Sequence, residues 1–67
     1  MEIFEESIYD KISGLTAEKE QMERMIAENI RLIAEGDDVE GRTYLKNHLE
    51  IEVKKKAAEI EKLNSEL

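Results

Sequence analysis

Few residues of this chain could do chemistry, and the only histidine is the natural starting point. His48 precedes Glu52 by four residues, so on a helix both side chains would share one face and could touch one metal ion. Two ligands make a poor metal site. The Glu-x-x-His motif of carboxylate metal proteins built on helical bundles also fails, because residue 45 is leucine. The sequence therefore predicts no metal site.

The acidic segment 37–41 (DDVEG) has the composition of a calcium-binding loop but not its spacing. Such a loop needs oxygen ligands at its first, third and fifth positions and a glutamate at its twelfth. Counted from Asp37, the later three positions hold Val39, Gly41 and His48. We expect the acids of this segment to cap a helix instead.

Nucleophilic catalysis and phosphate binding also lack their usual patterns. A serine or threonine nucleophile needs a neighbouring base, and the hydroxyl residues are dispersed along the chain as Ser7, Ser13, Thr16, Thr43 and Ser65. A phosphate loop needs Gly-Lys-Ser/Thr, which follows neither Gly36 nor Gly41. The sequence predicts a protein without enzymatic activity or cofactor.

The apolar residues are far more regular than these polar ones. When the chain is folded back at Gly36, they meet in pairs whose residue numbers sum to 75, which predicts an antiparallel hairpin of two helices. The predicted seam consists of Ile8, Ile12, Leu15, Met22, Ile26 and Ile30 opposite Leu67, Leu63, Ile60, Val53, Leu49 and Leu45.

The elements that produce this register are two long helices in a single all-α, coiled-coil-like domain. We expect the first helix over 2–35, a turn at 36–37 and the second helix over 38–66. Gly36 suits the left-handed residue that ends a helix. Asp37 with Glu40 three residues later forms a capping box for the next helix.

Two points along the helices stay open. Segment 13–16 (SGLT) could be part of a continuous helix, bent or not, or could break it, because glycine disfavours a helix interior and Thr16 could cap a new start. Lys19 faces Lys56 in the only layer of that pairing that is not apolar. These lysines either extend to the surface beside Glu23, Glu52 or Glu59, or form a polar layer that fixes register.

Several apolar residues are not needed by the seam. They gather toward the turn, and Tyr44, Ile51 and Ala58 follow one another at seven-residue steps on the outer side of the second helix. We expect a second interface, with another protein or with a second copy in a four-helix bundle. Its predicted residues are Met25, Leu32, Val39, Tyr44, Ile51 and Ala58.

The charge of the chain restricts its partners. Seventeen acidic and ten basic residues give a net charge of −7, the reverse of a nucleic-acid binder, and an anionic membrane surface would repel the chain. There is no cysteine and no 18-residue apolar run, so we expect a cytoplasmic protein without a membrane segment.

The leading functional hypothesis is a helical-hairpin module that binds another protein, as a small adaptor, regulator or inhibitor. An alternative is an acidic nucleic-acid mimic that inhibits a basic protein, because Glu2, Glu5, Glu6 and Asp10 form an acidic start. A hairpin dimer that binds RNA or DNA is less well supported, because the net charge opposes it.

Overall fold

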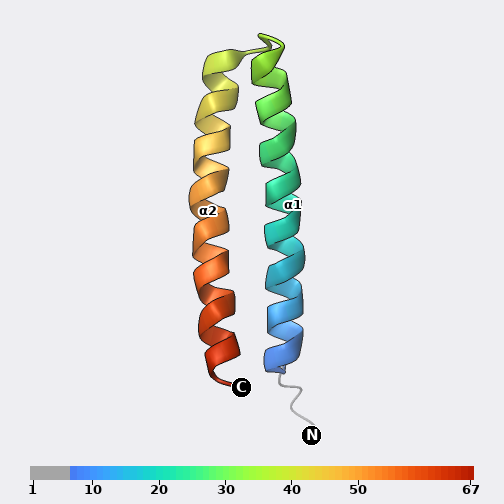
Figure 1. Cartoon of the computed structure of the whole chain (residues 1–67), viewed down its shortest axis with the longest axis vertical. Coiled ribbons are helices and arrows are strands. Elements are labelled where there is room, and N and C mark those ends of the chain that lie inside the picture. Colours follow the sequence, from blue (N-terminus) through green and yellow to red (C-terminus); the bar gives the residue numbers. More distant parts are fainter. Residues whose placement is uncertain (1–6) are drawn as a thin grey trace, which may run out of the picture.

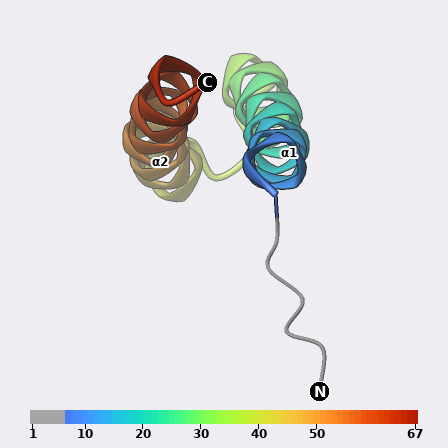
Figure 2. The same cartoon turned by 90° about the horizontal axis from the view of Figure 1, so that it is seen from below.

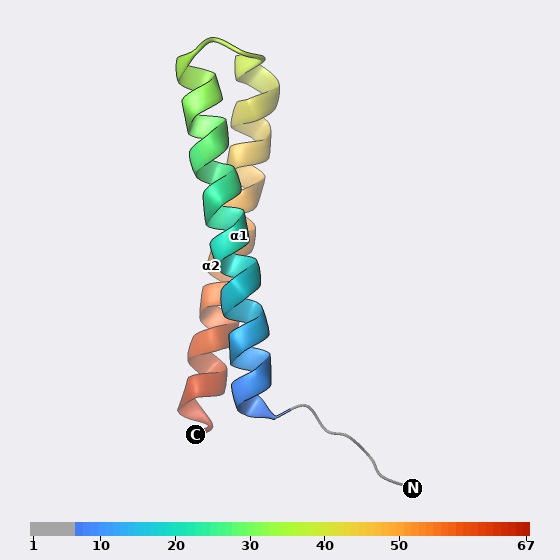
Figure 3. The same ribbon diagram turned by 90° about the vertical axis from the view of Figure 1, so that its right-hand side faces the viewer.

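The computed structural model describes residues 7–67 and shows two antiparallel helices joined by one tight turn (Figure 1). Helix α1 spans Ile8–Ala34 and helix α2 spans Val39–Ser65, 27 residues each. Figure 1 shows the helices side by side along their whole length, Figure 2 shows the pair from below, and in Figure 3 α1 lies in front of α2. The predicted all-α hairpin is confirmed. Within the described residues, neither helix is long and apolar enough to span a bilayer.

Helix α1 begins at Ile8 because Ser7 caps it. Ser7 has an extended backbone, and its Oγ accepts a hydrogen bond of 3.1 Å from the backbone N–H of Asp10. This is the usual arrangement of an N-cap serine. The sequence predicts a start at residue 2, and residues 2–6 of that prediction lie outside the described residues.

The helix continues without interruption through the segment that the sequence left open. Gly14 is helical, as are the residues on both sides of it. A Cβ added to Gly14 would meet nothing within 4 Å. No close approach of another element therefore requires a glycine here.

The turn begins at Gly36, the glycine that the sequence pattern predicts at the end of the first helix. Gly36 has φ +80°, and its N–H donates to the carbonyl of Ile33, while the Asp37 N–H donates to that of Leu32. These two bonds, each 3.0 Å long, form a Schellman motif that satisfies the last carbonyls of α1.

Helix α2 starts one residue later than the expected cap. Its N-cap is Asp38, in a left-handed conformation with φ 43° and no hydrogen bond from its side chain to the helix. Asp37 instead places Oδ2 3.4 Å from Arg42 Nη2. The Asp38 carboxylate crowds Gly41, where an added Cβ would lie 2.5 Å from Oδ2. An alanine at residue 41 would therefore require the exposed Asp38 side chain to move.

The two inner faces follow a heptad spacing of alternating three- and four-residue steps. On α1 the buried or half-buried positions of this pattern are Ile8, Ile12, Leu15, Lys19, Met22, Ile26, Asn29 and Ile33. On α2 they are Arg42, Lys46, Leu49, Val53, Lys56, Ile60 and Leu63. The 75-sum register thus agrees with the burial pattern of both helices.

Three residues of the predicted seam need correction. Ile30 is 52% exposed and Leu45 is 39% exposed, although their numbers sum to 75. The heptad steps place Asn29 and Ile33 on the inner face of α1 and Arg42 and Lys46 on that of α2, so the two apolar residues fall on the flanks. Leu67 is 59% exposed because it follows Glu66, the C-cap of α2.

The resulting core is very small. Among the described residues, Leu49 is the one apolar side chain that is buried. Asn29 is buried as well, and the remaining seam residues are half-buried. Two helices cannot enclose a side chain on every side, so the hairpin leaves much of its apolar surface in contact with water.

Candidate interaction surface

Polar side chains occupy the seam next to the turn. The Asn29 Nδ2 donates to the carbonyl of Met25 at 2.9 Å, and its Oδ1 accepts from Arg42 Nη1 at 3.3 Å. Arg42 also reaches Asp37, whereas its Nε is buried with no hydrogen-bond partner among the described residues. The hydrogen bond from Arg42 to Asn29 therefore links the two helices where an apolar core would be expected.

The lysine layer leaves the seam on two opposite sides. Lys19 pairs with Glu23 at 3.4 Å, and Lys56 pairs across the helices with Glu18 at 2.6 Å. The hydrogen bond from Lys56 to Glu18 raises the pKa of that lysine. Both ammonium groups therefore reach carboxylates at the surface, which supports the first of the two interpretations. Glu18 was not among the partners that the sequence suggested.

The predicted interface residues lie mainly on the surface. Tyr44 is 78% exposed and Ile51 is 54% exposed, on the side of α2 that faces away from α1. Ala58 continues this stripe and is exposed. Met25 and Val39 are exposed nearer the seam and the turn, and Leu32 is half-buried. The structure therefore distributes these six residues over more than one surface.

One flank of the hairpin forms a continuous surface that we call the groove face. It is made by residues at seven-residue steps beside the seam: Lys11, Glu18, Met25 and Leu32 of α1 and Leu45, Glu52, Glu59 and Glu66 of α2. The opposite flank, which we call the opposite face, contains Tyr9, Thr16, Glu23 and Ile30 of α1 and Thr43, Glu50, Ala57 and Asn64 of α2.

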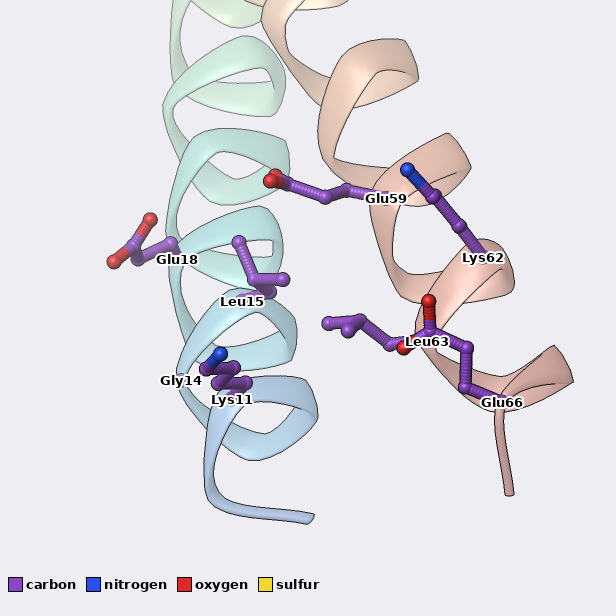
Figure 4. A pocket seen from close by; sticks show the side chains of 8 residues that line it. All are labelled: Lys11, Gly14, Leu15, Glu18, Glu59, Lys62, Leu63 and Glu66. Carbon is purple, nitrogen blue, oxygen red and sulfur yellow. The ribbon is translucent and has the colours of Figure 1, made fainter. Parts of the chain in front are cut away.

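Two open grooves lie along the groove face. The terminal groove, of about 480 Å³, is lined by Lys11, Gly14, Leu15, Glu18, Glu59, Lys62, Leu63 and Glu66. Leu15 and Leu63 point toward each other across its floor, and charged side chains surround them (Figure 4). The central groove, of about 510 Å³, is lined by Ala17, Glu18, Gln21, Met22, Met25 and Leu49. Both grooves combine an apolar floor with a polar rim, as binding surfaces do.

Arg31, in the last turn of α1, pairs with two carboxylates. Arg31 contacts Glu28 at 2.6 Å and Glu35 at 3.0 Å. The hydrogen bond from Arg31, reinforced by its charge, lowers the pKa of Glu28, and the same bond raises the pKa of Arg31. Such exposed pairs contribute little to stability.

The structure gives no chemical role to the remaining candidates. Within residues 7–67, no group of three potential ligands gathers closely enough to hold a metal ion, and His48 lies exposed on α2. Of the acids behind the nucleic-acid-mimic alternative, Asp10 lies in the first turn of α1, and Glu2, Glu5 and Glu6 lie outside the described residues.

Leu45 and the two grooves are features of the surface that the sequence pattern does not predict. The 75-sum pairing places Leu45 in the seam, because its number pairs with that of Ile30. Strict heptad counting from Leu49 would have placed it on the flank, seven residues before Glu52. The grooves could not be predicted from spacing, because the side chains that line each groove follow from the packing of the two helices.

No protein-family model, curated protein or solved structure matches the chain. The surface itself therefore carries the functional argument.

Proposed function

We propose that this chain is a non-enzymatic helical-hairpin module that acts in the cytoplasm by binding another protein, as an adaptor, regulator or inhibitor. One observation carries the proposal: six large apolar side chains are exposed in residues 22–53, which we call the turn half, whereas one apolar side chain in the described residues is buried. Folding alone therefore leaves these side chains in water, and a protein partner would cover them.

The stripe on the outer side of α2 suits such a partner best. Tyr44 and Ile51 lie two helical turns apart, at the spacing by which one helix anchors itself in a groove of another protein. Tyrosine is common at interface positions because its ring is large, rigid and amphipathic. The neighbouring His48 and Lys55 add polar groups that could surround the anchors.

The exposed apolar residues of the groove face, Met25 and Leu45, are proposed to be buried by assembly, either in a four-helix bundle or on the same partner. A chain of this size gains about 3–5 kcal/mol from a single core unless something else stabilises it. This chain has no cysteine to form a disulfide. Association is then the available source of additional stability.

The test compares two double variants of the tagged chain in lysate of its native host. Tyr44→Gln/Ile51→Gln removes the stripe, and Tyr9→Gln/Ile30→Gln is a matched control. The control changes the same residue types at similar exposure. Tyr9 is 70% exposed and Ile30 is 52% exposed, compared with 78% for Tyr44 and 54% for Ile51. We expect one protein to be captured by the wild type and the control, and to bind both again when purified.

The stripe variant should bind that purified partner at least about tenfold more weakly, because interface tyrosines often contribute more than 1.4 kcal/mol. Circular dichroism of both variants shows whether they remain helical. If the wild type binds no protein, or if both variants bind equally well, the proposed function is wrong.

A further inference from the structure

We infer that the groove face binds the groove face of a second copy of this chain, with the two hairpins antiparallel, so that the turn of one lies beside the termini of the other. This inference rests on the proposed function in one respect. The chain exposes two apolar surfaces, the groove face and the stripe of Tyr44 and Ile51, and the inference assigns the groove face to self-association. The stripe of Tyr44 and Ile51 then remains available to a different protein.

On the groove face, the projecting leucines and the floor of the terminal groove lie at similar distances from the middle of the hairpin, on opposite sides of it. Met22 and Val53 lie within one residue of the middle of their helices. Leu32 and Leu45 are about 15 and 12 Å from that level toward the turn, at 1.5 Å per residue. Leu15 and Leu63, the floor of the terminal groove, are about 10 and 15 Å from it toward the termini.

A two-fold axis at this level would therefore bring projecting leucines over the groove that can receive them. Leu32 would lie over α1 of the second copy near Leu15, and Leu45 over its α2 near Leu63. The central groove with Met25 would face its own equivalent. A parallel arrangement would instead place leucines against leucines and groove against groove.

The area of the groove face is sufficient for a stable dimer. Two 27-residue helices present a face about 40 Å long and about 20 Å wide, which is about 800 Å² per copy. This is the size of a standard specific interface. Association would also enclose Met22, Met25 and Leu49 between four helices rather than two.

Single cysteines test the face and the orientation together, because the chain has none of its own. Glu52 belongs to the groove face one residue from the middle, so two copies of Glu52→Cys would lie close together across the axis. Glu50→Cys is the matched control. It replaces the same residue type on the opposite face, and each glutamate pairs with one lysine of α2. We expect oxidation to link Glu52→Cys into a dimer and to leave Glu50→Cys unlinked.

Light scattering supplies the second measurement. The wild type should have twice the 7.8 kDa mass of one chain. Leu45→Lys should halve that mass, whereas Ile30→Lys, with the same charge change on the opposite face, should not. A monomeric wild type, cross-linking of Glu50→Cys, or no cross-linking of Glu52→Cys overturns the inference.

The two proposals fail separately. A monomer that still binds a partner through Tyr44 and Ile51 would disprove the dimer and leave the proposed function intact. A dimer with the expected cross-link that binds no other protein would disprove the proposed function and leave the dimer intact.

Discussion

The half of the hairpin next to the turn and the half next to the termini distribute their polar and apolar residues in opposite ways. In the terminal half the seam is formed by Ile12, Leu15, Ile60 and Leu63, interrupted by one lysine layer. In the turn half, the seam includes polar side chains at residues 29, 42 and 46. Among residues 7–67, eight large apolar side chains are exposed, and six of them belong to this half.

This difference shows that the turn half is not optimised for a hairpin that stands alone. A buried asparagine costs stability relative to a leucine, but it can fix the register of paired helices. Exposed apolar side chains next to it stabilise nothing until another surface covers them. The terminal half is therefore expected to hold the two helices together, and the turn half to fix their register and bind partners.

The largest expected effect comes from removing the one buried apolar side chain in the described residues. Leu49→Ala should destabilise the fold by about 2–5 kcal/mol, which is comparable to the whole stability of a chain of this size. Helical content by circular dichroism should fall sharply at room temperature. Ile51→Ala, two residues away on the outer side, should change stability by less than about 0.5 kcal/mol. Equal melting temperatures for these two variants would show that Leu49 is not the centre of the core.

The second prediction concerns a variant in which polar seam residues of the turn half are replaced by apolar ones, as in the seam of the terminal half. Asn29→Leu/Arg42→Leu removes both members of the interhelical hydrogen bond and should stabilise the protein by about 1–4 kcal/mol. The melting temperature should then rise by at least about 4 °C. Asn29→Leu alone should stabilise less, because Arg42 Nη1 loses an acceptor. A folded double variant that melts below the wild type would contradict the comparison.

The third prediction concerns the polar layer of the terminal half. Lys19→Leu/Lys56→Leu should raise the melting temperature, through an added stability of about 1–2 kcal/mol from apolar burial. The gain is smaller than in the turn half, because the lysine stems already cover the seam and their ammonium groups reach Glu23 and Glu18. If the variant unfolds, or if its stability is unchanged, the lysines do not occupy the layer assigned to them.

The hairpin could be predicted from sequence because its signals are local and repeated. The heptad spacing gives the inner faces from Ile8 to Ile26 and from Leu49 to Leu63, and Gly36 marks the turn. The prediction for Ile30 and Leu45 was wrong because it gave apolar character more weight than heptad phase. Asn29 and Lys46 occupy the layer where phase and hydrophobicity disagree.

The cap of α2 and the grooves could not be predicted for different reasons. The choice between Asp37 and Asp38 depends on the left-handed turn and on the contact of Asp37 with Arg42, neither of which spacing reveals. The groove face depends on the relative rotation of both helices. Sequence can suggest that rotation, but the side chains that line each groove follow only from the packed structure.

The fourth prediction compares a glycine inside helix α1 with a glycine at the turn. Gly14 is helical in the terminal half, with open space around an added Cβ, so Gly14→Ala should stabilise the protein by about 0.4–1 kcal/mol. Gly36 has φ +80° at the turn, so Gly36→Ala should destabilise it by more than that, about 1–2 kcal/mol. Thermal melts at equal protein concentration measure both changes. A loss of stability in Gly14→Ala would show that the glycine has a packing role.

The smallest expected effect concerns an exposed ion pair in the turn half. The hydrogen bond from Arg31 holds the pKa of Glu28 below its ordinary value of 4.5, so the ionised carboxylate stabilises the folded state above that pH. This contribution is lost as the pH falls through the folded-state pKa. Glu28→Gln should therefore melt slightly below the wild type at pH 7, and the difference should vanish in acid. Glu61→Gln, a change of the same charge on α2, is the control, and an equal effect of both variants would mean that net charge, rather than the Arg31 pair, is responsible.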